Sequence, residues 1–217
     1  MRPRAVGEFI GQDEIVGEGK LLRRILDKGR LESSIIFWGP PGCGKTTLAH
    51  LIAASVRSHF VFFSAVTSGI ADVRRIVAEA DGRLSTHNLR TILFVDEIHR
   101  FNKAQQDAFL PHIENGTIVL IGATTENPSF EVIPPLLSRC RVFTLKQLTE
   151  EDVVEILKST LKDTERGLGR IKVSVSENDL RYMAHLAAGD ARTALNAFEM
   201  LVESLDDGSG DLDGAAA

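Results

Sequence analysis

The sequence predicts an α/β protein, in which a parallel sheet flanked by helices is followed by a small all-helical domain. In the first two thirds of the chain, short unbroken apolar runs alternate with segments that carry apolar residues at helical spacing. This alternation is typical of a parallel sheet that helices cover on both faces. From about Lys146 the strand-like runs largely stop. We therefore expect an α/β domain over residues 1–145, a helical domain over 146–205 and a disordered, acidic and glycine-rich tail over 206–217.

Four apolar runs are predicted to form the strands of the sheet, and three segments between them are predicted to form helices. The strands are expected at 33–40, 59–66, 90–97 and 117–125, and the helices at 45–56, 70–84 and 102–114. The helix 70–84 is amphipathic, so one of its faces should be buried. That face holds Ile70, Val73, Ile76, Val77 and Ala80.

The helical domain is predicted from two capping patterns. The segment "LTEEDVVEILKSTLKD" opens with Thr-x-x-Asp, and "SENDLRYMAHLAAGDARTALNAFEMLVESL" opens with Ser-x-x-Asp. In such a box the hydroxyl oxygen accepts a backbone N–H of the first turn, while the acid accepts the N–H of the capping residue. Both segments are therefore expected to begin helices just after the hydroxyl residue.

Composition excludes several classes of protein. With 217 residues, 43% of them hydrophobic, the chain can bury a sizeable core. A net charge of −5 provides no general basic field, so any contact with nucleic acid must rest on a local patch. Cys43 and Cys140 are too few for a disulfide framework, and no zinc pattern is present. The start "MRPRAVGEFIGQ" lacks the apolar core of a signal peptide and no apolar run reaches ~18 residues, so we expect an intracellular protein without a membrane partner.

The stretch "GPPGCGKTT" is the strongest chemical signal and fits the pattern G-x-x-x-x-G-K-[ST]. Its glycines let backbone N–H groups approach phosphate oxygens, and the helix that follows points its positive end at them. Lys45 adds a cation for the β- and γ-phosphates, and the Thr46 hydroxyl is a ligand for Mg²⁺. A thiol between two of these glycines, that of Cys43, predicts a site sensitive to oxidation. The predicted nucleotide contacts are Gly39, Pro40, Pro41, Gly42, Cys43, Gly44, Lys45, Thr46 and Thr47.

The run "ILFVDEIHR" predicts the second half of the site. Four apolar residues lead to Asp96 and Glu97 at the carboxyl end of a strand, where open α/β sheets bind ligands. Asp96 suits the ligand shell of Mg²⁺, and Glu97 is placed to polarise an attacking water. The adjacent pair of acids favours hydrolysis over transfer to another acceptor. His99 is expected to have a polar or interfacial role and not to ligate a metal.

The run "IGATTENPSF" places Thr124 and Thr125 at the end of the next predicted strand. A polar residue there lies between the two halves of the site and can orient the water or contact the γ-phosphate. The two threonines are adjacent, so the sequence leaves the choice open, and we prefer Thr124.

Several motifs together resemble an AAA+ ATPase of the clamp-loader branch. They are the two nucleotide-site motifs (Walker A and Walker B), the strand end "GATTENPSFEV", the element "LLSRC" and the late "GDARTALN". The string "DEIHRFNKAQQDAFLPHIENGTIVLIGATTENPSF" resembles more closely the RarA (MgsA) proteins of bacteria and the Werner-helicase-interacting protein of eukaryotes, and the similarity covers roughly residues 2–202. The resemblance implies a P-loop AAA+ fold with a helical lid and Mg²⁺-dependent hydrolysis of ATP. It also implies a place in the nucleus of a eukaryote or in the cytoplasm or nucleoid of a bacterium.

The resemblance implies further site residues. The opening "RPRAVGEFIGQ" is similar to the entry segment of the family, in which Phe9, Ile10 and Gly11 would pack around adenine. From the residues alone, this segment is expected to be a glycine-punctuated loop with a buried Phe-Ile pair. Arg192 in "GDARTALN" matches the sensor-2 arginine, which reaches from the lid to the phosphates. Ser64 falls near the position of the switch residue that restrains the catalytic acid in relatives.

The stretch "PPLLSRCRV" contains Arg139, which the resemblance implies is an arginine finger. In the family this element follows the sensor strand by a short helix and lies at the subunit edge. We expect that Arg139 cannot fold back on its own phosphate loop, because the lid and Arg192 occupy that approach. Its predicted target is therefore the γ-phosphate bound by a neighbouring subunit.

The resemblance also implies partners. The resembled family acts on DNA at replication forks, so single-stranded or forked DNA, other copies of the chain in the full-length protein, and replication proteins are the predicted partners. The candidate DNA contacts are Arg74, Arg75, Arg83, Arg100 and Lys103. A solvated helix face explains any one of these charges equally well.

The implied function is that of an ATP-hydrolysing AAA+ module in replication-fork maintenance and recombination. One alternative is a clamp-loader or branch-migration subunit with the same chemistry. Another is an interaction module that binds ATP without hydrolysing it. Intact residues at the predicted site, which are Lys45, Asp96, Glu97 and Arg192, argue against the last alternative.

Overall fold

The structure is a computed structural model that describes residues 1–56, 58–65 and 69–206, without the side chains of residues 70, 205 and 206. Asp206 ends the last helix. The remainder of the predicted tail, 207–217, therefore lies outside the described residues, as does the side chain of Ile70.

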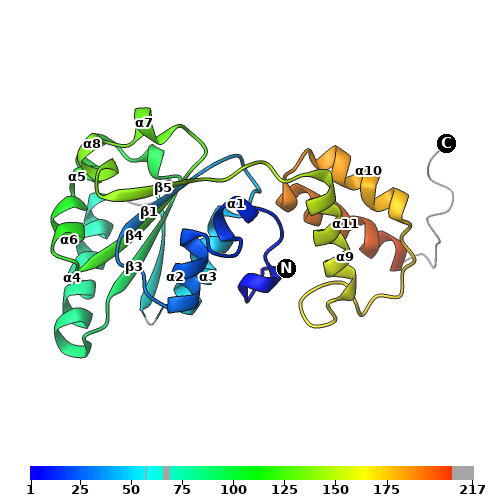
Figure 1. The fold of residues 1–217 in the computed structure, drawn as a ribbon, viewed down its shortest axis with the longest axis horizontal. Coiled ribbons are helices and arrows are strands. Elements are labelled where there is room, and N and C mark those ends of the chain that lie inside the picture. Colours follow the sequence, from blue (N-terminus) through cyan, green and yellow to red (C-terminus); the bar gives the residue numbers. More distant parts are fainter. Residues whose placement is uncertain (57, 66–68, 207–217) are drawn as a thin grey trace.

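A five-stranded parallel sheet forms the first part of the molecule, with the strand order β2-β3-β4-β1-β5 (Figure 1). The strands are β1 (Ser34–Trp38), β2 (His59–Ser64), β3 (Thr91–Asp96), β4 (Ile118–Thr124) and β5 (Cys140–Thr144). The four strands expected from the sequence are confirmed. The sequence did not predict β5, because this strand lies at the sheet edge and carries exposed residues between half-buried ones, so it has no unbroken apolar run.

Helices cover both faces of the sheet, as the apolar strands predicted. One face packs against α1 (Asp13–Val16), α2 (Leu21–Lys28) and α3 (Lys45–Ser55). The other packs against α4 (Ile70–His87), η2 (Ile98–Arg100), α6 (Leu110–Glu114) and α8 (Pro134–Leu137). Successive strand residues point alternately to the two faces of the sheet, and each face has its own hydrophobic core. Ile35 and Phe37 belong to the first core, on the side of α3, and Ile36 belongs to the second, on the side of α4. The predicted inner face of α4 is buried at Val73, Ile76, Val77 and Ala80.

The predicted helix 102–114 is wrong as a single helix. The structure has α5 (Lys103–Asp107) and α6 (Leu110–Glu114), with Ala108 and Phe109 between them. Pro111 in the first turn of α6 has no N–H to continue the ladder of α5, and the interruption turns the Phe109 ring fully into the core. The chain before β1 is also more ordered than expected, since η1 (Val6–Glu8) precedes α1 and α2.

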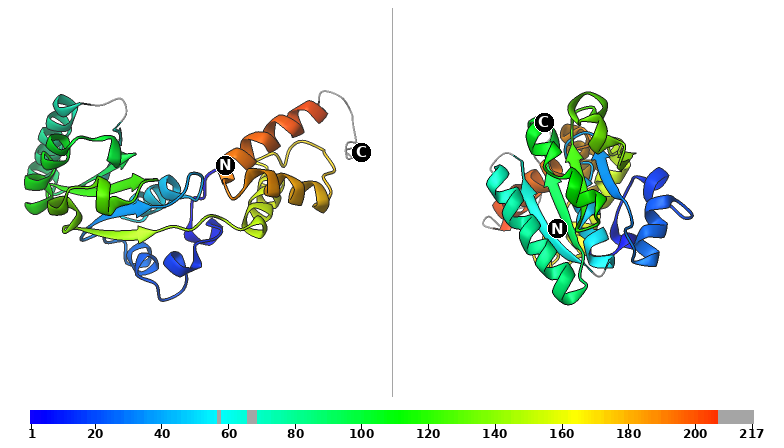
Figure 2. Two further views of the ribbon diagram at one scale, coloured as in Figure 1. Left: turned by 90° about the horizontal axis from the view of Figure 1, so that it is seen from above. Right: turned by 90° about the vertical axis from the view of Figure 1, so that its left-hand side faces the viewer.

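A helical part follows the sheet, built from α9 (Glu150–Lys162), α10 (Glu177–Ala187) and α11 (Ala191–Asp206) around its own core. Both predicted capping boxes are present, from Thr149 to Asp152 and from Ser176 to Asp179. Figures 1 and 2 show the helical part beyond the end of β5, with the N-terminal segment between it and the sheet. The remaining element, α7 (Pro128–Glu131), precedes α8. Within the described residues, no helix is both long and apolar enough to cross a membrane.

Candidate functional site

The loop between β1 and α3, residues 39–44, has the backbone of an anion-binding site. Gly42 and Gly44 have φ angles of +68° and +104°, a left-handed conformation that glycine adopts without strain. The next residue, Lys45, begins α3, so the unpaired N–H groups of its first turn open onto the loop. The sequence thus folds here into a set of backbone donors at a helix N-terminus, and this set fits the phosphates of a nucleotide.

Lys45 and the two threonines after it line this loop. The Lys45 side chain is 8% exposed, and its Nζ donates hydrogen bonds of 2.7 Å to the carbonyl oxygens of both Gly39 and Pro40. These bonds hold a cation at the mouth of the loop. Thr46 and Thr47 stand half-buried in the first turn of α3.

The helical part reaches this loop through Asp190. A Cβ atom added to Gly42 would come within 1.9 Å of Asp190 Oδ1, so the carboxyl group lies directly against the glycine. The same oxygen accepts the backbone N–H groups of Arg192 (2.8 Å) and Thr193 (3.1 Å), which caps the first turn of α11. The fold therefore brings the first turn of α11, with the exposed side chain of Arg192, to a loop about 150 positions away in the sequence.

The N-terminal segment also touches the loop. A Cβ atom on Gly44 would lie 2.8 Å from Cζ of Phe9, so the phenyl ring covers this glycine. Gly11 has a φ of +78°, and its Cβ would meet Leu148 at 2.8 Å. The sequence expectation of a buried Phe-Ile pair is wrong, because Phe9 and Ile10 are only half-buried. Phe9 packs against both Gly44 of the loop and the edge of the first core.

Asp96 and Glu97 lie at the carboxyl end of β3, both half-buried. Glu97 has a φ of 54°, so the chain turns sharply directly after the strand. One carboxylate oxygen of Glu97, Oε2, is buried and makes no hydrogen bond within the described part of the chain. Ser64 is the direct partner of Asp96 in the pairing of β2 with β3, which puts it beside the two acids.

Thr124 ends β4, and β4 lies between β1 and β3 in the sheet. Its position is therefore between the phosphate loop and the acid pair. The Thr124 side chain is fully buried, and its hydroxyl lies 2.9 Å from Nδ1 of His99. Thr125 is half-buried. Of the two threonines, Thr124 is the one whose hydroxyl is joined by hydrogen bonds to the residues beside the acid pair. Among the residues with a described structure, no three His, Cys, Asp or Glu side chains gather as a metal site.

Arg139 does not join the site. It directly precedes Cys140, which pairs with Ser34 at the amino ends of β5 and β1, whereas the phosphate loop follows the carboxyl end of β1. Its guanidinium pairs with Glu114 and donates 2.6 Å to the carbonyl of Pro135. The length of a five-residue strand, roughly 16 Å, therefore separates Arg139 from its own loop. The sequence predicted that the lid keeps Arg139 from its own loop. In the structure the separation comes instead from the position of Arg139 at the opposite end of the sheet.

Cys43 is buried, with 1% of its surface exposed. Burial raises the pKa of its thiol, and the nearby Lys45 ammonium opposes this shift only in part. Because the thiolate is the reactive form, a buried thiol with a raised pKa is poorly reactive. The predicted sensitivity of this site to oxidation is therefore not favoured by the structure.

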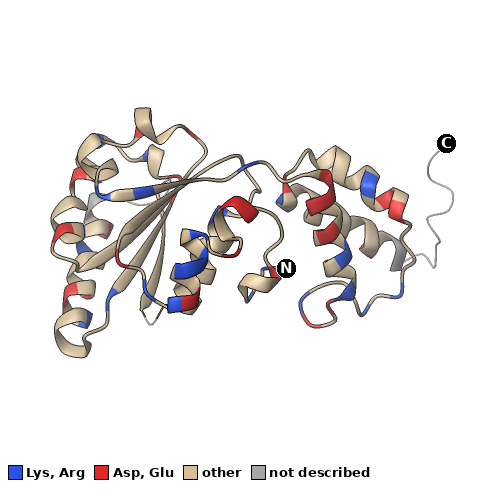
Figure 3. Ribbon diagram, viewed as in Figure 1, with Lys and Arg blue, Asp and Glu red and all other residues tan. Residues whose placement is uncertain are grey.

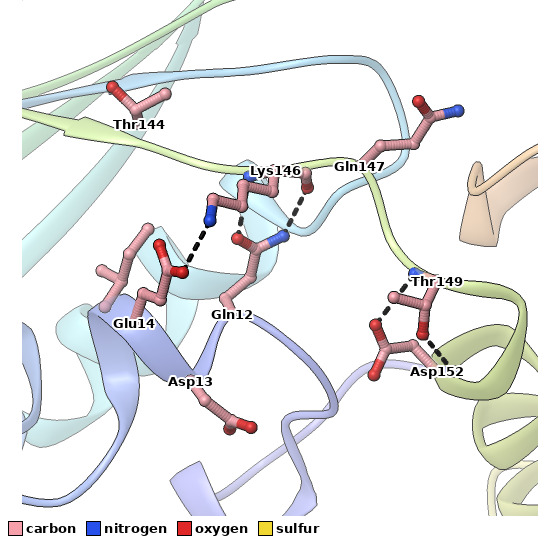
Figure 4. Close-up of a pocket in the computed structure, with 9 residues that line it drawn as sticks. Gln12, Asp13, Glu14, Thr144, Lys146, Gln147, Thr149 and Asp152 are labelled. Carbon is pink, nitrogen blue, oxygen red and sulfur yellow. Dashed lines mark hydrogen bonds and ion pairs between the residues drawn. The ribbon is translucent and has the colours of Figure 1, made fainter.

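Gln12 has a structural role that the sequence did not predict. Its side-chain amide donates 2.6 Å to the carbonyl of Lys146 and accepts the Lys146 N–H at 2.9 Å, while Lys146 Nζ pairs with Glu14 (Figure 4). The same Gln12 nitrogen lies 3.4 Å from the carbonyl oxygen of Cys43. Gln12 thus connects the phosphate loop to the segment that leads into the helical part. Gln12 ends the quoted segment "RPRAVGEFIGQ", but a single polar residue does not reveal a contact across 134 positions.

Comparison with known proteins gives relatives over nearly the whole chain. The profile of the family described as "ATPase family associated with various cellular activities (AAA)" matches residues 35–148. The chain is 50% identical to replication-associated recombination protein A of Haemophilus influenzae, over 95% of this chain and 46% of that protein. It is 43% identical to "ATPase WRNIP1" of Dictyostelium discoideum, over 94% of this chain and 23% of that protein. These similarities confirm the resemblance predicted from the sequence.

The fold is similar to that of a solved motor protein. A structure titled "Thermotoga maritima RuvB Holliday junction branch migration motor" has a TM-score of 0.77 and 29% sequence identity, covering 97% of this chain and 68% of that chain. The predicted fold class is thereby confirmed. The chain spans about half the length of the bacterial relatives, 45–46%.

Proposed function

Because the chain belongs to the AAA family of ATPases, we propose that it hydrolyses ATP and that residues 39–47 hold the phosphates. Family membership implies nucleotide binding. The observation that carries the further step to hydrolysis is the buried, unbonded oxygen of Glu97 at the end of β3. A carboxylate with a free lone pair at the same carboxyl edge of the sheet as a phosphate-binding loop can accept a proton from an attacking water.

Each residue at the loop has a proposed task. Lys45, already held at the loop by two carbonyl oxygens, turns its ammonium to the β- and γ-phosphates when nucleotide enters. Thr46 and Asp96 are the residues that would hold Mg²⁺, which when bound neutralises charge on the phosphate oxygens. Glu97 orients the water, and Thr124, whose enclosed hydroxyl is hydrogen-bonded within the described chain, supports this arrangement from the strand between them.

We assign the segment 146–205 as the lid of this site and 1–145 as the nucleotide-binding domain. The contact of Asp190 with Gly42 supports this division, since it sets the first turn of α11 against the phosphate loop. From there Arg192 reaches the phosphates. Phe9, Ile10 and Gly11, which lie between the loop and Leu148, contact the adenine.

For the full-length protein we propose a role in maintaining replication forks and in recombination, inside the cell, on single-stranded or forked DNA and with replication proteins. The names of the relatives at 41–50% identity support this role.

Basic and acidic side chains are mixed along the chain: Lys and Arg are interspersed with Asp and Glu over the ribbon (Figure 3). Arg75 and Arg83 both pair with Glu79, at 3.1 and 2.8 Å. This leaves three of the candidate DNA contacts exposed and outside any ion pair of the described residues: Arg74, Arg100 and Lys103.

A branch-migration motor is the second candidate function, and the fold similarity to RuvB favours it. The 50% identity to replication-associated recombination protein A, against 29% to RuvB, favours the first. Movement of a four-way junction at a rate that depends on ATP would decide for the second candidate. Stimulation of turnover by forked DNA, without such movement, would decide for the first.

The ATPase proposal is tested by phosphate release in the presence of Mg²⁺, with and without forked DNA. We expect Lys45→Ala to abolish binding of a fluorescent ATP analogue, because the cation for the phosphates is lost. Glu97→Gln should keep the analogue bound and lower kcat by about 10²–10⁴-fold, since the proton acceptor is lost. Lys28→Ala, on the exposed end of α2, is the matched control and should behave as wild type. Binding of the analogue without any phosphate release by wild type would instead identify a non-hydrolysing interaction module.

A further inference from the structure

We propose that His99 is a positioning residue that is hydrogen-bonded to the Thr124 hydroxyl and lies against the Glu97 carboxylate, so that it fixes the acid relative to the end of β4. This inference rests on the proposed ATPase function and deepens it. Through His99, the acid at the end of β3 is connected to the polar end of β4, the strand beside the phosphate loop.

The geometry joins three side chains through a single nitrogen. Nδ1 of His99 lies 2.9 Å from Oγ1 of Thr124 and 3.3 Å from Oε2 of Glu97. The His99 side chain is 13% exposed, so little water competes for this nitrogen. The Thr124 hydroxyl is fully enclosed. His99 is therefore a polar group enclosed between the acid to which we assign the water and the end of β4.

The hydrogen bonds of Thr124 determine which nitrogen of His99 carries the proton. The Thr124 oxygen accepts the N–H of Glu126 at 3.0 Å, and its own hydrogen points to the carbonyl of Glu126 at 3.2 Å. Its second lone pair is thus left for a donor, and Nδ1 is the group within reach. A proton on Nδ1 satisfies Thr124 and also faces the buried oxygen of Glu97, which has no hydrogen bond of its own in the described chain. Without that proton, the lone pair of Nδ1 would face a carboxylate oxygen at 3.3 Å.

His99 therefore carries its proton on Nδ1, which is hydrogen-bonded to Thr124 and lies 3.3 Å from the Glu97 carboxylate. The backbone φ of 54° fixes how the chain turns at Glu97 but not the direction of its carboxylate, which rotates about the side-chain torsions. Its carboxylate needs a side-chain contact to keep one direction. His99 supplies that contact, and any shift at the end of β4 is transmitted to Glu97 through it.

The test compares three substitutions of His99 in the chain. The side-chain amide of asparagine can place an N–H where Nδ1 stands, whereas that of glutamine reaches the position of Nε2. We expect His99→Ala and His99→Gln to lower kcat by about 10–100-fold, the effect of a misplaced catalytic group. The KM for ATP and the affinity for a fluorescent ATP analogue should stay within about twofold of wild type. His99→Asn should recover most of the lost kcat. In the Glu97→Gln background, His99→Ala should have no further effect, because the group that it positions is absent.

A second readout does not depend on turnover. The ¹⁵N chemical shifts of the His99 ring should show a protonated Nδ1 in wild type. In Thr124→Val, which keeps the shape but loses the hydroxyl, the Nδ1 signal should shift. A ring protonated on Nε2 alone in wild type, or no shift in Thr124→Val, would overturn the inference even in an active enzyme.

The kinetic outcomes separate this inference from the proposed function. If wild type turns over ATP but His99→Asn is as slow as His99→Gln, the proposed role of His99 is overturned and the ATPase proposal stands. If the His99 variants lose nucleotide affinity by the same factor as kcat, His99 has a structural role only, and the positioning role is again overturned. A wild type that binds ATP and hydrolyses none would overturn both proposals together.

Discussion

Single glycines in this chain are fixed by close contacts, and Gly42 is the sharpest case. Gly42→Ala would place a Cβ atom 1.9 Å from the Asp190 carboxyl oxygen, at a backbone φ of +68° that disfavours alanine. We expect the substitution to move α11 away from the phosphate loop and to lower the affinity for a fluorescent ATP analogue by at least tenfold, measured by titration.

Gly82→Ala is the matched control for Gly42→Ala. A Cβ atom on Gly82 meets nothing within 4 Å inside α4, so this change should raise the free energy of unfolding by about 0.5–1 kcal/mol and leave binding unchanged. Equal affinities for both variants would contradict the assigned contact.

At the scale of elements, the N-terminal segment is joined to the loop after α9 by Arg166. This guanidinium pairs with Glu8 at 3.1 Å and with Asp163 at 2.7 Å. The pKa of Glu8 lies below its ordinary value of 4.5, first because its carboxylate accepts the backbone N–H of Arg4 and then because of Arg166. The pKa of Asp163 is likewise below 3.8, first through the backbone N–H of Arg166. Carboxylates with lowered pKa values stabilise the folded state above their unfolded-state pKa, and this contribution is lost as the pH falls through the folded-state values.

We therefore expect the Tm to fall as the pH is lowered from about 6 to 3. Arg166→Gln should remove part of this pH dependence, because the Glu8 carboxylate loses its charged partner. Arg181→Gln is the control. Its exposed ion pair with Glu177 is 3.3 Å long within one helix, and the pKa of Glu177 is lowered mainly by Lys158 and to a smaller extent by Arg181. Thermal unfolding followed by circular dichroism across this pH range measures the effect. Identical pH profiles for wild type and Arg166→Gln would rule the connection out as a source of stability.

For the whole molecule, the position of Arg139 at the amino ends of the strands predicts an assembly. Only a neighbouring copy can bring a guanidinium from that end to a phosphate loop at the other end. We expect specific ATPase activity to rise with protein concentration, and Arg139→Ala to lower it by about 10³–10⁵-fold, as for other arginine fingers. Mixing Arg139→Ala with Glu97→Gln should restore part of the activity, since each variant supplies the group that the other lacks.

Arg141→Ala is the control for this experiment. Arg141 is an exposed arginine two residues further along, within β5, and should not affect turnover. A rate per subunit that does not depend on concentration, with an active Arg139→Ala variant, would show that this arginine has no role in trans.

The sequence by itself determined the features that depend on neighbouring residues. The strands β1 to β4, the phosphate loop with Lys45 and the two capping boxes each follow from a short stretch of sequence, because apolar runs, glycine spacing and hydroxyl-acid pairs act locally. The acid pair at Asp96 and Glu97 follows for the same reason, since it directly ends a strand.

Only the tertiary structure decided which of these stretches meet. The contacts of Gly42 with Asp190 and of Gln12 with Lys146 join residues more than 130 positions apart, and no local pattern shows that the two members of each pair meet. The edge strand β5 forms because β1 offers it a free side, and its partly exposed sequence carries no strong strand signal. The hydrogen bonds of His99 exist because β3 and β4 end side by side. Sequence periodicity records which face of an element is buried, but the partner on that face is chosen by packing of the whole chain.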